Sequence, residues 1–279
     1  MLNIQSMSGE TRFTGAFFLL AMTFVFLEFA YARLAHHEDT HDTAETLASA
    51  SVGIGSVVAK VVTSGLSAVP FFFFYTHRIF DIPMQTAWAW GALFLGVEFF
   101  YYWFHRASHR VRWLWASHAV HHSATRFNLS AAVRLGWTGQ LSGAFVFFLP
   151  LAWLGFHPVA IAFMIGLGLL YQFFLHTSFD VPLGPLEWVL NTPRHHRVHH
   201  ASNEACLDTN YGSVLIIFDR IFGTFAQAPQ DEPIRFGVKG RTASNNPLKI
   251  ALGEWGYLVR DVVRARGIKN RMRVLFGPP

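Results

Sequence analysis

Charged residues and cysteine are both scarce in this chain. Asp, Glu, Lys and Arg make up 14% of its 279 residues, whereas hydrophobic residues make up 52%. The single cysteine, Cys206, excludes an internal disulfide and any metal site built from several thiolates, so we interpret it as an inert thiol. The sequence also has no Gly-rich nucleotide loop and no low-complexity tract. This composition argues against an ordinary soluble protein and against a disulfide scaffold.

Several apolar stretches are long enough to cross a bilayer, for which about 20 residues suffice. A cleaved signal peptide is the alternative for the first of them, with Ala30-Tyr-Ala32 as a nominal cleavage site. Because that run is long and Arg12 is its only leading cation, a retained helix is favoured. The sequence predicts an all-α integral membrane bundle of about four to five helices. The expected spans are residues 13–34, 47–75 and 84–104, then a helical hairpin of residues 136–156 and 158–175.

Acidic side chains interrupt these apolar stretches. Glu28 lies in the first expected span and Glu98 in the third. A carboxylate at the depth of Glu98 is costly, so Glu98 is a candidate functional group, with a structural hydrogen bond as the alternative. Farther along, Asp219 and Arg220 interrupt the apolar residues 214–225, and a salt bridge between them is the simplest interpretation.

Histidines concentrate in three short groups. Residues three and four apart on a helix share one face, with β-carbons about 5–6 Å apart, so the members of each group are expected to converge. Imidazole nitrogen binds zinc, iron, copper and nickel, and eight such rings exceed what one tetrahedral ion can use. The sequence therefore predicts a two-metal site. Chance proximity among 15 histidines is the alternative, and it accounts for scattered ones such as His77 and His157. The groups are His105 with His109, then His118, His121 and His122, then His196, His199 and His200.

The hairpin predicts a further ligand. Two crossings of the membrane return the chain to the side it left, so His176 is expected beside the first histidine groups as a metal ligand. The alternative is that His176 is a polar residue that ends the helix. Asp180 could join it on one helical face, but Pro182 indicates that the helix ends there. Thr192 as N-cap and Pro193 at the first position predict the start of the helix that carries the last histidines.

A second histidine pattern matches a protease motif without the structural context that the motif requires. Residues 37–41 read His-Glu-Asp-Thr-His, which satisfies the zinc-protease pattern of two helical histidines and a glutamate base. Because the segment is hydrophilic on all faces, a solvated loop is the better interpretation.

Positive charge follows the spans. The net charge of +5 fits cytoplasmic loops beside membrane helices, and we expect no nucleic-acid partner. The cytoplasmic side is assigned from the arginines after the third span: Arg106, Arg110, Arg112, Arg126 and Arg134. From Gly237 onward, nine Lys or Arg face two acids, which is typical of an amphipathic helix on anionic lipid, with a solvated helix as the alternative. We expect N-terminal membrane helices at 1–83, a catalytic domain at 84–233 and a basic amphipathic segment at 234–279.

The number and position of the histidines indicate which chemistry the metals would support. Structural zinc is seldom held by histidine alone, whereas imidazole-rich sites with open positions favour iron–oxygen chemistry. Histidines at the cytoplasmic ends of apolar helices lie where a lipid could reach the metals from the bilayer. The sequence therefore predicts a membrane oxidase that positions a C–H bond and excludes water. A non-catalytic metal carrier or sensor is the alternative, although its ligands should lie along a path at mid-bilayer. A membrane zinc protease comes third.

These motifs resemble those of the fatty acid hydroxylase/sterol desaturase superfamily over about residues 99–225. The shared motifs are His105-x3-His109, His118-x2-His121-His122, Thr192-Pro193-x2-His196-Arg-Val-His199-His200, Asp208-x-Asn210-Tyr211-Gly212 and Asp219-Arg220-x-Phe222-Gly223-Thr224. The sequence around Phe127-Asn128-Leu129-Ser130 and residues 184–200 is most similar to the alkylglycerol monooxygenase-like branch and its bacterial members.

The resemblance implies a membrane enzyme with two iron ions that uses O2 to hydroxylate or desaturate a lipid or sterol-like substrate. It implies metal ligation by His105, His109, His118, His121, His122, His196, His199 and His200, and extra ligands at His176 and His195. Asp180 stands where some relatives carry another histidine. It also implies an external electron donor of the ferredoxin, cytochrome b5 or tetrahydropterin type. The expected location is a bacterial inner membrane, or the endoplasmic reticulum in a eukaryote. Zinc in place of iron is a further expectation for a purified sample.

Overall fold

A computed structural model describes residues 4–35 and 40–279, with side chains from residue 18 onward. In that part of the chain every regular element is helical, and β-type pairing is limited to two isolated bridges. Among the described elements, short 3-10 helices at Ala144–Phe148, Gly184–Trp188 and Glu204–Cys206 lie between the α-helices. The α-helices are α1 (Ile4–Leu34), α2 (Thr43–Thr76), α3 (Ala87–Arg110), α4 (Arg112–His122), α5 (Leu129–Ala132), α6 (Leu149–Leu154), α7 (Pro158–Leu175), α8 (Pro193–His199), α9 (Ile217–Ile221), α10 (Pro247–Arg264) and α11 (Ile268–Phe276).

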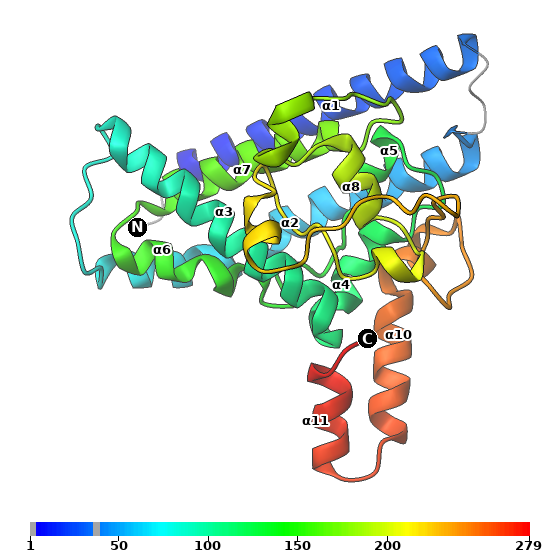
Figure 1. Cartoon of the computed structure of the whole chain (residues 1–279). Coiled ribbons are helices and arrows are strands. Elements are labelled where there is room, and N and C mark those ends of the chain that lie inside the picture. The colour runs from blue at the N-terminus through cyan, green and yellow to red at the C-terminus, as the bar shows by residue number, and fades with distance from the viewer. Residues whose placement is uncertain (1–3, 36–39) are drawn as a thin grey trace.

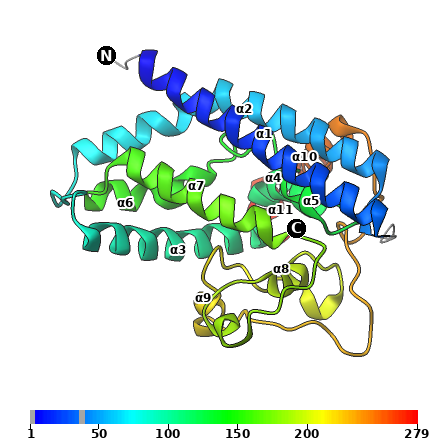
Figure 2. The same ribbon diagram turned by 90° about the horizontal axis from the view of Figure 1, so that it is seen from above.

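The long helices α1, α2 and α7 run in broadly the same direction, and α3 crosses them at an angle; together they form the body of the molecule (Figures 1 and 2). One end of this bundle is covered by the short helices α4, α5 and α8 and by the loops around them, which form a cap (Figure 1). The α10–α11 hairpin projects from the body at a steep angle to the long helices (Figure 1). This arrangement brings the histidine-bearing segments together in the cap.

Two of the described helices, α2 and α7, are long and apolar enough to span a membrane by length and composition. Their outer faces carry large uncovered apolar side chains, such as Val62 (78% exposed) on α2 and Phe163 (49%) on α7. In water, such a surface would be unfavourable at roughly 25 cal/mol per Å². The same surface is stable in lipid, as expected for a membrane protein.

The predicted helix over residues 136–156 is wrong in length. Residues 137–143 form turns, and the helical part is confined to Ala144–Leu154, because Gly143 adopts a left-handed conformation (φ 80°) and Pro150 favours the first turn of a new helix. The turn after it is as predicted. At Gly155 φ is 125°, and a β-carbon would lie 2.1 Å from the Phe80 carbonyl oxygen, so only glycine fits.

An apolar core joins α3, α6 and α7, with Leu93, Val97, Leu151 and Ile161 all buried. At Gly96 a β-carbon would lie 2.7 Å from the Leu151 side chain, so this glycine allows α3 and α6 to approach closely. This packing fixes α3, whose last turns extend past the expected end of the span and carry His105 and His109.

Two of the acidic side chains noted in the sequence hold loops to the core. Glu98 accepts hydrogen bonds from the backbone N–H groups of Val214 and Leu215 (2.9 and 2.8 Å), which supports the structural interpretation. The predicted salt bridge between Asp219 and Arg220 is wrong. Asp219 accepts from backbone N–H groups after α8, whereas Arg220 donates to backbone carbonyls near α8. Adjacent residues on a helix do not face each other, so the two side chains meet different surroundings.

Candidate metal centre

Nine histidines in the cap form two groups whose nitrogen atoms could each hold a metal ion. Within each group the nitrogen atoms lie within 4.8 Å of one another. Group one consists of His105, His109, His118, His122 and His199, and group two consists of His121, His176, His196 and His200. The groups adjoin, because the rings of His122 and His200 stack with centroids 4.3 Å apart. The structure thus brings together nine of the ten histidines that the sequence singled out.

Each His-x-x-His-His motif contributes to both groups. On α4, His118 and His122 belong to group one and His121 to group two. On α8 the assignment is reversed: His196 and His200 belong to group two, whereas His199 belongs to group one. At 3.6 residues per turn, side chains four apart differ by about 40° around the helix axis and adjacent ones by about 100°. The adjacent histidines at the end of each motif therefore diverge toward different groups. The prediction that all three histidines of each motif converge is thus wrong for His121 and His199, which join the other group.

Backbone carbonyls orient three of these rings. The Nδ1–H of His105 donates to Tyr211 O (2.8 Å), that of His199 to Thr209 O (2.7 Å), and that of His176 to Gln172 O (2.8 Å). Such outer contacts fix the tautomer and leave Nε2 free to bind a metal, as they do in known metal sites. The carbonyls of Thr209 and Tyr211 lie in one loop, which is fixed by hydrogen bonds from the Tyr211 N–H to Asp219 and from the Asn210 side chain to the His195 carbonyl.

The nitrogen atoms that face each group's centre fit a cation. In group one, Nε2 of His105 lies 3.0 Å from Nε2 of His118, and in group two Nε2 of His176 lies 3.0 Å from Nε2 of His121. In addition, Nε2 of His109 and Nε2 of His199 are buried without a hydrogen-bond partner. An unpaired buried polar atom costs about 1–3 kcal/mol, and a bound metal would remove that cost. The donor sets therefore suit one transition ion per group.

Burial also keeps the rings neutral. Desolvation lowers the pKa of every histidine in both groups, with neighbouring imidazoles or charged groups adding to it at most of them. The pKa of His121 and the pKa of His199 fall to about 4. Since neutral imidazole is the form that binds a metal, no proton need be displaced at neutral pH.

His195 is the predicted ligand that lies outside both groups. Its ring packs edge-on against Phe225, with centroids 5.3 Å apart. It precedes His196 on α8 and therefore points away from the centre of group two. The helix start is as predicted, with Pro193 in the first turn and Thr192 accepting from the His195 N–H (3.4 Å).

His176 and Asp180 do not share one site in the structure. His176 caps the C-terminal end of α7 and joins group two. Asp180 instead lies at the surface and forms a bidentate ion pair with Arg194 (2.6 and 2.7 Å). Of the protease-like pattern, His37 and Glu38 lie outside the described residues. His41 is buried beside Glu28, at 3.3 Å, and belongs to neither group.

Glu28 holds segments that adjoin the histidine groups to α1. Its carboxylate accepts from the N–H of Leu129 (2.7 Å), the N–H of Ser178 (2.8 Å) and the hydroxyl of Thr177 (2.8 Å). The last two residues directly follow His176. From the sequence, Glu28 is a carboxylate within an apolar span, and nothing there indicates which segments it joins.

Arg134 is a positioning residue that the sequence missed. It was expected among the surface cations, yet it is buried and pairs with Glu45 (3.5 Å). The Arg134 carbonyl lies 3.4 Å from Nδ1 of His121, so this ion pair supports a group-two ring. No local pattern around Arg134 distinguishes it from the surface arginines nearby.

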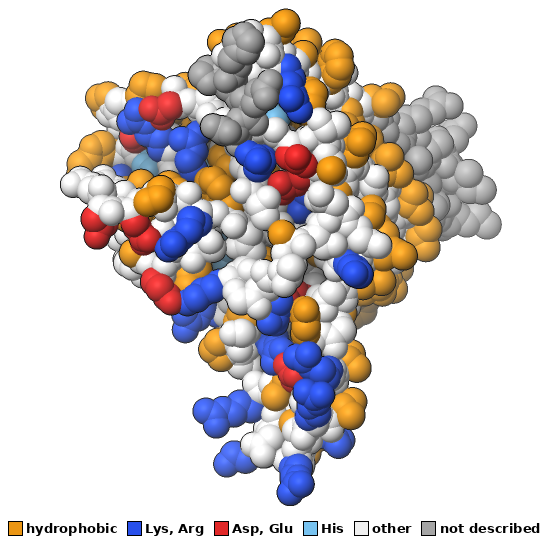
Figure 3. Space-filling model, turned by 90° about the vertical axis from the view of Figure 1, so that its right-hand side faces the viewer, with side chains coloured by type: hydrophobic (Ala, Val, Ile, Leu, Met, Phe, Trp, Pro, Cys, Tyr) orange, Lys and Arg blue, Asp and Glu red, His pale blue; other side chains and the backbone are white. Residues whose placement is uncertain are grey.

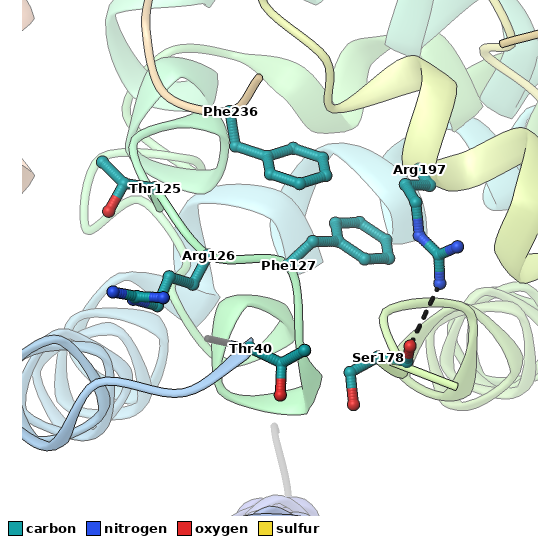
Figure 4. A pocket seen from close by; sticks show the side chains of 7 residues that line it. All are labelled: Thr40, Thr125, Arg126, Phe127, Ser178, Arg197 and Phe236. Carbon is teal, nitrogen blue, oxygen red and sulfur yellow. Dashed lines mark hydrogen bonds between the residues drawn. The ribbon is translucent and has the colours of Figure 1, made fainter. Parts of the chain in front are cut away.

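A pocket of about 480 Å³ lies beside group two (Figure 4). Phe127 forms part of its wall and contacts the rings of His176 and His200, with centroids 5.5 and 5.4 Å apart. Phe236 stacks on Phe127, and Arg197 reaches the Ser178 carbonyl (3.4 Å) on the opposite side. The remaining lining residues are Thr40, Thr125 and Arg126. One aromatic ring therefore separates this pocket from group two.

The segment that carries both histidine groups is similar to known proteins. Residues 90–224 match the family model described as "Fatty acid hydroxylase". The chain is 37% identical over 234 residues to alkylglycerol monooxygenase from Xenopus tropicalis, covering 84% of this chain and 52% of the relative. It is 35% identical over 151 residues to an ornithine lipid hydroxylase from Rhizobium tropici, covering 52% of this chain and 44% of the relative. The chain spans about half the length of the curated relatives it matches. No solved structure matches it.

Proposed function

We propose that this chain, whose residues 90–224 match the fatty acid hydroxylase family model, is a membrane-bound, O2-dependent lipid hydroxylase that uses two iron ions. The observation that carries the proposal is that both histidine groups lie within this segment and adjoin each other in the cap. We assign the metal ligands to the nine histidines of groups one and two, and we leave His195 out because its ring lies elsewhere.

These histidines would hold two iron ions, which would supply the O2 chemistry of hydroxylation. In that reaction O2, two external electrons and two protons convert a C–H group to C–OH and release one water. The protein's contribution is to hold its ligands ready. Carbonyls orient the rings of His105, His176 and His199, and burial keeps those rings neutral. Preorganised ligands need no rearrangement on metal binding.

The surroundings of the groups limit the access of water. The aromatic ring of Tyr211 is buried and contacts the rings of His105, His109 and His199, and Phe127 covers His176. Excluding water protects a strongly oxidising site from unproductive reactions. No further residue needs to act as a nucleophile or a general base in this scheme.

The substrate in this proposal is a lipid. The relatives' names refer to an alkylglycerol, an ornithine lipid and, for a rat relative 29% identical over 132 residues, a methylsterol. The apolar outer faces of α2 and α7 allow such a molecule to approach within the bilayer. The cap faces the cytoplasm in this scheme, and the electron donor is external, of the ferredoxin, cytochrome b5 or tetrahydropterin type. Desaturation is the near variant, since it also begins at a C–H bond.

The proposal is tested in cells that express the gene. Lipid extracts made under ¹⁸O2 should contain a species heavier by one labelled oxygen atom, and His199→Ala should abolish it with the fold kept. His77→Ala is the control, since His77 is exposed at the end of α2. A labelled lipid formed equally by His199→Ala would refute the proposal, as would iron-containing protein that changes no lipid, which a metal carrier or sensor would give.

A further inference from the structure

The α10–α11 hairpin stands apart from the rest of the molecule. In Figure 1 it runs at a steep angle to α1, α2 and α7, and in Figure 2, turned by 90°, it is seen nearly end-on. Both views therefore agree on its direction. If α2 and α7 cross the membrane, an element perpendicular to them lies parallel to the membrane plane.

The hairpin is fixed to the cap at its base. On α10, Ile250, Ala251 and Leu258 are buried, and the Trp255 ring donates to the Thr138 hydroxyl (2.8 Å). At the other end, the Gly277 carbonyl accepts from the Arg112 N–H at the start of α4 (2.9 Å). The direction of the hairpin relative to the bundle is therefore set by specific contacts.

Both helices carry rows of uncovered apolar side chains. On α10, Val259 and Val263 are 59% and 71% exposed, and on α11, Ile268 and Met272 are 76% and 46% exposed. Residues four apart share one helical face, so each pair forms part of a stripe, which Phe276 extends on α11. A helix that is simply solvated has no need of such stripes.

Unpaired positive charge accompanies these stripes. Residues 264–279 contain five Lys or Arg and no acid. None of the five forms an ion pair with any residue that the structure describes. In Figure 3 the projecting lower part of the molecule shows a concentration of Lys and Arg side chains. The cations are Arg264, Arg266, Lys269, Arg271 and Arg273.

We propose that the α10–α11 hairpin lies in the headgroup region of an anionic bilayer, with its apolar stripes at the acyl boundary and its cations on lipid phosphates. Amphipathic helices rich in Lys and Arg bind membranes in this way, and long basic side chains reach the headgroups while their stems stay in apolar surroundings. An acidic protein would neutralise the cations but leave the apolar stripes uncovered. A lipid surface satisfies both features and matches the direction of the hairpin.

The test measures depth in the bilayer with spin labels on the full-length protein. The native Cys206 is buried and is replaced in a Cys206→Ala background. Labels are placed at Met272→Cys on the stripe and at Asp231→Cys on an exposed loop as the aqueous reference. The protein is reconstituted into nanodiscs of phosphatidylcholine alone or with phosphatidylglycerol. At Met272 the label should be more accessible to O2 than to a water-soluble nickel chelate, and the difference should increase with phosphatidylglycerol.

A matched pair of variants separates charge from apolar contact. Lys269→Glu with Arg273→Glu should remove the effect of phosphatidylglycerol at Met272. Arg235→Glu with Lys239→Glu makes the same change in net charge on loops outside the hairpin and should leave the effect intact. A label at Met272 that is as accessible to nickel as the one at Asp231 would overturn the proposal. Protection from both reagents would do so too, because it indicates a protein partner or a second copy of this chain.

Discussion

Loss of the Glu28 carboxylate should detach the segment that follows His176. Glu28→Ala leaves the N–H groups of Leu129 and Ser178 and the hydroxyl of Thr177 without their acceptor. At about 1–3 kcal/mol for each unpaired buried donor, and with water entering to offset part of it, we expect a destabilisation of about 3–6 kcal/mol. This is a large fraction of the stability of a typical domain, which is about 5–15 kcal/mol.

The structure also predicts where that damage falls. Because Thr177 and Ser178 directly follow His176, the Glu28→Ala variant should lose metal from group two before group one. The assay combines thermal unfolding in detergent with metal analysis of the purified protein. Glu28→Gln is the comparison variant: it keeps one oxygen acceptor and should fall between the wild type and Glu28→Ala. Unchanged stability together with full metal content in Glu28→Ala would refute the assigned role of Glu28.

Four further outcomes are expected. Glu98→Ala should lower the unfolding temperature, because two loop N–H groups lose their acceptor at about 1–3 kcal/mol each, whereas Glu98→Gln should retain part of the stability. Gly155→Ala should lower the yield of folded protein, since φ is 125° and the strain exceeds about 1–2 kcal/mol. Asp180→Asn should change stability by less than about 1 kcal/mol and leave the metal content unchanged, because its ion pair is exposed. Metal-free protein should lose stability as pH falls from 6.5 toward 4, because His121 and His199 take up protons there only in the unfolded chain. The expected loss is about 1.4 kcal/mol per pH unit for each of the two histidines. A flat profile in pH-dependent unfolding would contradict this.

The histidines of the two groups could be found in the sequence because their spacing is local. The histidine pairs four residues apart converge as helical periodicity predicts, and the N-cap at Thr192 fixes the start of α8. The division into two groups could not be found in the same way. Periodicity indicates that His121 and His122 diverge, but only the partner helices on either side determine which group each ring joins.

Other features depended on contacts between distant segments. Arg134 has the same local surroundings as a surface arginine, and only the arrival of Glu45 from α2 makes it a buried partner. The membrane helix predicted over residues 136–156 failed because hydropathy does not register the left-handed Gly143. Asp219 and Arg220 are adjacent in sequence, yet their partners lie in different loops.

Metal analysis of paired histidine variants tests the central claim most directly. The wild type should bind two metal ions per chain, one for each group. His118→Ala with His122→Ala should remove the ion of group one, and His196→Ala with His200→Ala should remove the ion of group two, so that each retains about one. Wild-type protein that binds no metal, or paired variants that both keep the full content, would contradict the account.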